Sequence, residues 1–184
     1  MSSLPFACRC GTVRGRVTEV PAGTHARCYC RSCRAAAIHT GEGDPGQEGV
    51  TVWQTTPDRI EFDSGADHLA VFSFGEKNLL RWQASCCGAA LFNTMRSPQM
   101  PFAALHTPRL ADTAALGPVS CAAFKPLPIG KARHENKRKM VGVVLRMLGA
   151  RLSSRWRKTP FFRDGAPVSE VQVLPPGTRE RLVG

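Results

Sequence analysis

The stretch CRCGTVRGRV, residues 8–17, opens with two cysteines and a glycine and then alternates in the manner of a β-strand. Two further stretches are also rich in cysteine, CYCRSC at residues 28–33 and SCCG at residues 85–88. Thiolates one or two residues apart converge easily on a metal ion, whereas a disulfide between such near neighbours is geometrically awkward. Cysteine-only donor sets favour zinc, with an iron–sulfur cluster as the alternative. The sequence therefore predicts one or two zinc ions.

The length of 184 residues suits one domain with an extension and allows a real hydrophobic core. No cationic region followed by a long apolar stretch opens the chain, and no apolar run approaches the roughly 20 residues that span a bilayer. We therefore expect a cytoplasmic protein without a transmembrane segment, in which the cysteines are thiols or metal ligands.

Short strand-like runs separated by turn residues follow the second cysteine group, at residues 50–54, 60–62, 69–74 and 78–83. This rhythm predicts a mainly β fold of short antiparallel strands. The pattern changes after Pro128. We expect a zinc-binding β domain over residues 1–128 and a basic helical extension and tail over residues 129–184, in which residues 168–174 can add an edge strand.

The extension contains a predicted basic amphipathic helix, over residues 134–156. Eleven basic residues and one acidic residue lie between Lys131 and Arg163. One interpretation is a helix docked on the β domain, or on a second copy of the chain, through Val141, Leu145, Leu148 and Leu152. The others are binding of nucleic acid or another acidic partner, and attachment to an anionic membrane surface.

Together, the strings CRCGTVRGRV, CYCRSCR and RWQASCCGAALF resemble the glutathione-dependent formaldehyde-activating enzymes, a family that includes centromere protein V-like proteins. The resemblance covers about residues 6–93. It implies a zinc-held β-tent of the Mss4-like type. It also implies carbon–sulfur lyase chemistry, in which formaldehyde and glutathione combine into S-hydroxymethylglutathione. The partner would be a small thiol or thiol adduct such as glutathione.

The resemblance assigns the two kinds of zinc site to different cysteines. Cys28, Cys30 and Cys33 would hold a reactive zinc, and their three thiolates leave one ligand position open. The structural zinc would be held by Cys8, Cys10 and Cys87.

The third cysteine group departs from the family pattern. A family cysteine is expected at position 84, where this chain has Ala84. Cys86 is the obvious substitute, but neighbouring strand residues point to opposite faces, so Cys86 and Cys87 reach one ion only if the backbone bends. The alternatives are a site with three thiolates and water, or no second site.

Other readings of the same residues stay open. The group at residues 28–33 can be purely structural, in which case the chain would be a non-catalytic zinc module that binds through its basic helix. His39 is a candidate fourth ligand or proton carrier, and Arg31 and Arg34 are candidates to lower thiol pKa values or to bind a carboxylate. Cys121 stands alone, which favours a buried small hydrophobic residue.

Overall fold

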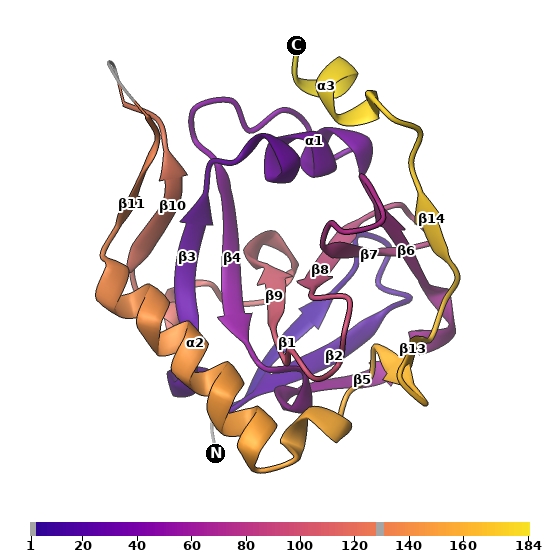
Figure 1. Cartoon of the computed structure of the whole chain (residues 1–184). Helices are drawn as coiled ribbons and strands as arrows, with labels where there is room; N and C mark the ends of the chain where they lie inside the picture. The colour runs from indigo at the N-terminus through magenta and orange to yellow at the C-terminus, as the bar shows by residue number, and fades with distance from the viewer. Residues whose placement is uncertain (1–2, 128–130) are drawn as a thin grey trace.

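A computed structural model describes residues 3–127 and 131–184. The fold is mainly β, as predicted, with fourteen strands and three α-helices among the described residues (Figure 1). The largest element is a mixed nine-stranded sheet in which only the β10–β3 and β14–β6 pairs are parallel. Its strands are, in spatial order, β11 (Arg133–Glu135), β10 (Cys121–Lys125), β3 (Thr24–Cys28), β4 (Val50–Thr55), β9 (Ala103–His106), β8 (Ala90–Thr94), β7 (Leu80–Ala84), β6 (Leu69–Ser73) and β14 (Val171–Val173).

A smaller antiparallel sheet packs beside the nine-stranded one and encloses the main core between them. It consists of β1 (Ser3–Ala7), β2 (Arg14–Thr18) and β5 (Ile60–Ser64). The rings of Phe6 and Phe161 each lie 5.1 Å from the ring of Phe92, in edge-on contacts that aromatic pairs favour. Because Phe161 is fully buried, the chain beyond the basic helix completes this core.

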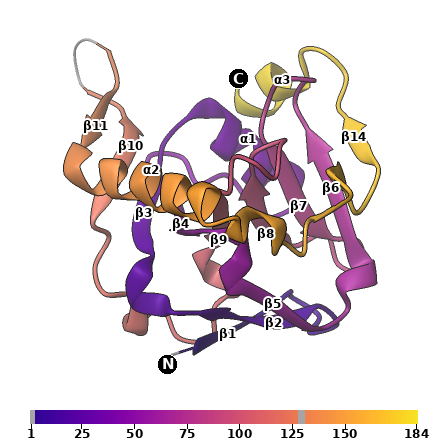
Figure 2. The same cartoon turned by 60° about the horizontal axis from the view of Figure 1, so that its bottom comes forward.

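The opposite face of the nine-stranded sheet carries α1 (Arg31–His39) and α2 (Lys137–Leu152). Alternate residues of a strand share a face, and Ala26 and Cys28 of β3 therefore point to the same side. There Ala26 packs in one apolar cluster with Cys33 of α1 and Met140 of α2. Figure 2 shows α2 crossing β3 and β4.

The basic helix begins later than predicted and docks through a different face. Residues 133–135 form β11 against β10, so the helix starts at Lys137 instead of residue 134. The buried residues of α2 are Val143 and Ala150, and Arg146 donates a hydrogen bond to the Thr24 hydroxyl. Docking of the predicted face on the β domain is wrong, because its members are 50 to 79% exposed, namely Val141, Leu145, Leu148 and Leu152. Docking of this face on a second copy of the chain stays a prediction.

The C-terminal tail lies along the β fold. β14 pairs in parallel with β6, which confirms the edge strand predicted near residues 168–174. The tail ends in α3 (Thr178–Val183), which lies beside α1 in both views, and a short hairpin, β12 (Phe162–Arg163) with β13 (Ala166–Pro167), precedes β14. The predicted boundary between residues 128 and 129 falls outside the described residues. No helix in the described ranges has the length and apolarity needed to cross a membrane.

Candidate metal centres

The first candidate site, here called the inner cluster, consists of Cys28, Cys30 and Cys33. Cys28 ends β3, Cys30 caps the N-terminus of α1, and Cys33 lies in its first turn. The sulfur of Cys30 accepts a hydrogen bond from the backbone N–H of Cys33 at 3.3 Å. All three sulfurs lie within 4.8 Å of one another. The strand-to-helix junction therefore gathers three thiols at the positive end of a helix, where thiolates are stabilised.

A buried arginine faces the inner cluster. Arg81 of β7 is 4% exposed, and both of its terminal nitrogens lie 4.0 Å from the sulfur of Cys33. Among the described residues, no carboxylate lies within ion-pair distance of its guanidinium. A buried cation needs a compensating negative charge, and the thiolates of the inner cluster are the groups that supply it.

Two further buried polar side chains continue from Arg81 across the sheet. Arg81 donates to the side-chain oxygen Oδ1 of Asn93 at 3.0 Å, and the side-chain nitrogen Nδ2 of Asn93 lies 3.4 Å from Nε2 of His106. An amide nitrogen only donates, so Nε2 accepts and His106 is neutral. Burial, with the charges of Arg81 and Arg109, lowers the pKa of His106 to about 3, which agrees with that assignment.

The thiols of the inner cluster differ in their readiness to ionise. Hydrogen bonds from Cys28 and Cys33 lower the pKa of Cys30. The hydrogen bond that Cys28 donates to Cys30, across 3.4 Å, raises the pKa of Cys28. Cys30 is therefore the thiol of the inner cluster that ionises most readily.

The second candidate site, here called the outer cluster, unites residues far apart in the sequence. It contains Cys8 and Cys10 from the first cysteine-rich stretch and Cys86 and Cys87 from the third. All four sulfurs lie within 4.8 Å of one another. Cys10 and Cys86 are exposed. The hydroxyl of Thr12 is the main cause of a Cys10 pKa of about 6.

The backbone bends where two adjacent cysteines had to point to one site. β7 ends at Ala84, and the N–H of Gly88 donates back to the Ala84 carbonyl at 2.7 Å. Gly88 has a φ of +72°, which glycine adopts without strain. Because residues 85–88 form this turn instead of a strand, Cys86 and Cys87 both reach the outer cluster, with Ala84 buried in the core.

The sulfur spacing fits a tetrahedral metal ion. Zinc–sulfur bonds of about 2.3 Å in a tetrahedron separate the sulfurs by about 3.8 Å. In the outer cluster the Cys8–Cys10, Cys8–Cys86 and Cys10–Cys86 distances are 3.5, 3.9 and 3.4 Å. All eight cysteines are free thiols, so disulfides do not compete for these sulfurs. Both clusters can therefore hold a metal ion, the outer with four thiolates and the inner with three.

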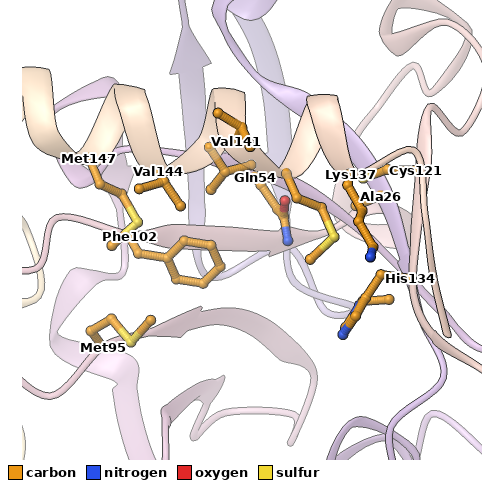
Figure 3. Close-up of a pocket in the computed structure, with 13 residues that line it drawn as sticks. Ala26, Gln54, Met95, Phe102, Cys121, His134, Lys137, Val141, Val144 and Met147 are labelled. Carbon is orange, nitrogen blue, oxygen red and sulfur yellow. The ribbon is translucent and has the colours of Figure 1, made fainter. Parts of the chain in front are cut away.

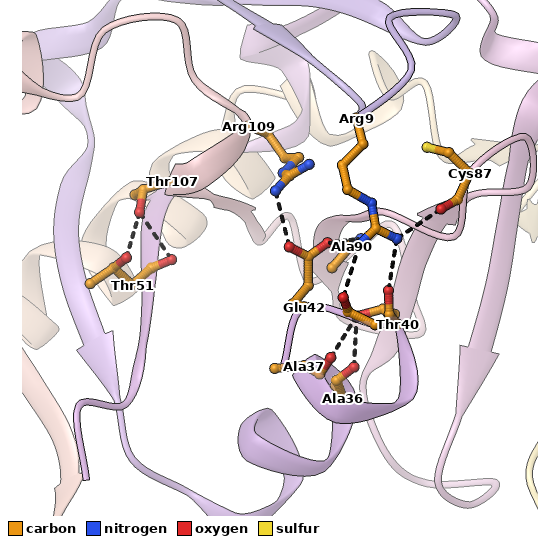
Figure 4. A network of polar contacts seen from close by, with 11 residues as sticks. Arg9, Ala36, Ala37, Thr40, Glu42, Thr51, Cys87, Ala90, Thr107 and Arg109 are labelled. Carbon is orange, nitrogen blue, oxygen red and sulfur yellow. Dashed lines mark hydrogen bonds and ion pairs between the residues drawn. The ribbon is translucent and has the colours of Figure 1, made fainter. Parts of the chain in front are cut away.

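One arginine joins the outer cluster to the loop that follows α1 (Figure 4). Arg9, which lies between Cys8 and Cys10, donates to the carbonyls of Thr40 and Gly41 after α1 and to that of Cys87. Glu42 extends the contact by accepting from Arg109 at 3.0 Å. The outer cluster is thereby fixed to the end of the helix whose beginning carries the inner cluster.

Several other sequence candidates lie away from the clusters. Arg34 pairs with Asp44 at 2.7 Å and Arg31 donates to the carbonyl of Gly184, and neither arginine makes a hydrogen bond to a thiol of the described residues. His39 packs on Phe72 with ring centres 4.5 Å apart and is not part of either cluster.

Two findings complete the comparison with the sequence. Cys121 is buried in an apolar cluster, as expected. Sequence reasoning missed Arg81, Asn93 and His106. Arg81 alternates with apolar residues in β7, a pattern that predicts an exposed face, so the sequence carries no signal that Arg81 is buried.

The fold and the two clusters define a class, a mainly β protein with cysteine sites that can hold metal ions. The chain belongs to the Family of unknown function (DUF6151), which it matches over residues 1–172. No curated protein matches the chain significantly. The chain is similar to a Rhodobacter sphaeroides protein of known crystal structure, with 19% identity, coverage of 62% of this chain and 96% of that chain, and a TM-score of 0.44. The resemblance to the formaldehyde-activating enzymes remains a prediction.

Proposed function

We propose that the inner cluster is the active site of a zinc-dependent protein that makes or breaks a carbon–sulfur bond in a thiol adduct, of the glutathione type. The supporting observation is the buried Arg81 beside Cys33 in a cluster of three thiols. Three thiolates and a zinc ion together carry one negative charge, which the single guanidinium balances. The same positive charge favours the ionised form of a further thiol that binds beside Cys33, which is the property that a site for thiol chemistry requires.

The proposed reaction joins a thiol and an aldehyde without any other reactant. One sulfur–carbon bond forms, the carbonyl π bond breaks, and the thiol proton ends on the new hydroxyl oxygen. A zinc ion held by Cys28, Cys30 and Cys33 would supply Lewis acidity that favours the thiolate form of a substrate.

The residues of the chain itself supply the surrounding charge and order. Arg81 lowers the pKa of any thiol that arrives beside Cys33, because a positive charge favours the ionised form. Asn93 accepts from Arg81 and so fixes the direction of the guanidinium. Because His106 is neutral, Arg81 is the single cation in the row of buried polar side chains formed by Arg81, Asn93 and His106.

We further propose that each cluster binds one zinc ion, the outer one for stability. Elemental analysis of purified protein is expected to give two zinc ions per chain. Cys30→Ala should lose the inner ion and Cys87→Ala the outer ion. A common loss of both ions in either variant would contradict two independent sites.

The test of activity is NMR exchange between formaldehyde and glutathione. Zinc-loaded protein is expected to accelerate the exchange over buffer. Cys30→Ala should abolish the acceleration, and Cys121→Ala, which removes a buried cysteine outside both clusters, should retain it. If the zinc-loaded wild type gives only the buffer rate, the chain does not act on formaldehyde and glutathione.

A further inference from the structure

α2 presents an apolar surface to solvent, here called the outer ridge. It consists of Val141, Val144, Leu145, Leu148 and Leu152, which are 50 to 79% exposed. These five make up half of the ten large apolar side chains that are exposed in the described ranges. Contiguous exposed apolar residues of this kind mark a contact with a partner or a membrane.

Cations surround the outer ridge. Lys137 and Arg138 lie at the start of α2 and Arg151 at its end, all exposed. In the parts of the chain that the structure describes, no carboxylate lies within 4.0 Å of these three side chains. Trp156 follows the helix, half-buried, with the guanidinium of Arg157 5.4 Å from its ring centre. An aromatic ring at the end of a basic apolar helix suits a membrane interface.

A groove of about 540 Å³ opens beside the ridge, between α2 and the sheet (Figure 3). It exists because Ala26, Cys121 and Ala123 form a floor of small side chains that the helix does not fill. Val141 and Val144 belong to both the groove and the ridge. The lining is predominantly apolar, and the volume is in the range of natural ligand sites. An acyl chain is a ligand that such a groove can accept next to the ridge.

We propose that α2 docks on an anionic membrane surface, with the outer ridge at the boundary of head groups and acyl chains. Charge complementarity selects this partner, since Lys137, Arg138 and Arg151 lie at the two ends of the ridge with no carboxylate of the described residues within 4.0 Å. A second copy of the chain would bring these like charges together. Nucleic acid would leave the ridge without an apolar partner, although phosphates would attract the cations.

The test is flotation of the full chain with vesicles of phosphatidylcholine alone and of phosphatidylcholine with 30% phosphatidylglycerol. Binding is expected only to the anionic vesicles and should fall as salt is added. Trp53 and Trp82 are buried, so a blue shift of tryptophan emission on binding should come from Trp156 and be lost in Trp156→Phe.

Paired variants separate the ridge from the cations. Leu145→Gln with Leu148→Gln is expected to weaken binding about tenfold, from the loss of apolar burial. The matched control is Met100→Gln, which changes a side chain of similar exposure in a loop. It should bind like the wild type. Lys137→Gln, Arg138→Gln and Arg151→Gln combined should weaken binding about a hundredfold at low salt, at about fivefold for each cation.

Three results would overturn the proposal. Equal binding to neutral and anionic vesicles, or none to either, would remove the charge argument. A wild-type dimer that Leu145→Gln with Leu148→Gln converts to a monomer would identify a second copy as the partner. Binding of a 20-base-pair DNA duplex that survives the ridge substitutions and exceeds vesicle binding would assign the cations to nucleic acid.

Discussion

Replacing Arg81 by methionine should weaken zinc binding at the inner cluster and leave the outer cluster unchanged. The guanidinium nitrogens lie 4.0 Å from the sulfur of Cys33, and the side chain is buried. At an effective dielectric constant of 20, unit charges at that distance interact by about 4 kcal/mol. That is an upper bound for the loss and corresponds to a factor of about a thousand in affinity. We expect a decrease of a hundredfold to a thousandfold.

The assay is competition with a chromogenic zinc chelator, with the outer ion as an internal reference in the same molecule. Arg81→Lys separates charge from hydrogen bonding, since it retains a cation but loses the planar donor group that Asn93 accepts from. It should recover most of the affinity. Arg81→Met protein that binds both ions as tightly as the wild type would show that Arg81 does not balance the charge of the inner cluster.

Three further predictions concern the outer cluster, pH and the core. Cys86→Ser should lose about one zinc ion per chain by elemental analysis and Cys121→Ser none, because Cys86 belongs to the outer cluster and Cys121 belongs to neither cluster. Burial lowers the pKa of His106 to about 3 from an ordinary value of 6.5, so the unfolded chain takes up the proton first as pH falls below 6.5. Between pH 7.5 and 5 the wild type should therefore lose about 2 kcal/mol more unfolding free energy than His106→Gln, measured by urea denaturation; equal losses would contradict a buried neutral histidine. Phe161→Ala should cost about 3–5 kcal/mol in the same assay and Phe124→Ala, an exposed site, less than about 1, whereas similar costs would argue against Phe161 as a core residue.

The features that the sequence predicted are those that local patterns encode. Short alternating runs bounded by turn residues indicated a mainly β fold, because the pattern that predicts a strand is complete within five or six residues. The inner cluster is equally local, since Cys28 and Cys33 are five positions apart. The spacing alone brings such thiols together, as the structure shows.

The features that the sequence did not predict depend on tertiary contacts. Arg81 faces Cys33 only because β7 pairs with β8 and α1 lies over that face, and no local pattern encodes this arrangement. The docking face of α2 was predicted wrongly because apolar residues surround most of the helix. A wide apolar arc does not say which part of it meets the sheet, and Val143 was buried in place of Leu145. Residues 85–88 form a turn, but the sequence of this segment was equally compatible with a continuing strand.

The sequence spacing of the two clusters also sets an order of assembly during synthesis. The inner cluster closes a loop of six residues, so it can take up metal as soon as residue 33 has left the ribosome. The outer cluster joins Cys8 to Cys86, 78 positions apart. The hydrogen bond that Arg9 donates near this cluster also needs the carbonyl of Cys87. Closing the longer loop costs more chain entropy, and a metal ion that closes it restrains more of the unfolded chain. The N-terminal cysteines must therefore stay reduced and unpaired until Cys86 and Cys87 emerge, so the outer cluster forms later than the inner one, although strands β8 to β14 are still to follow.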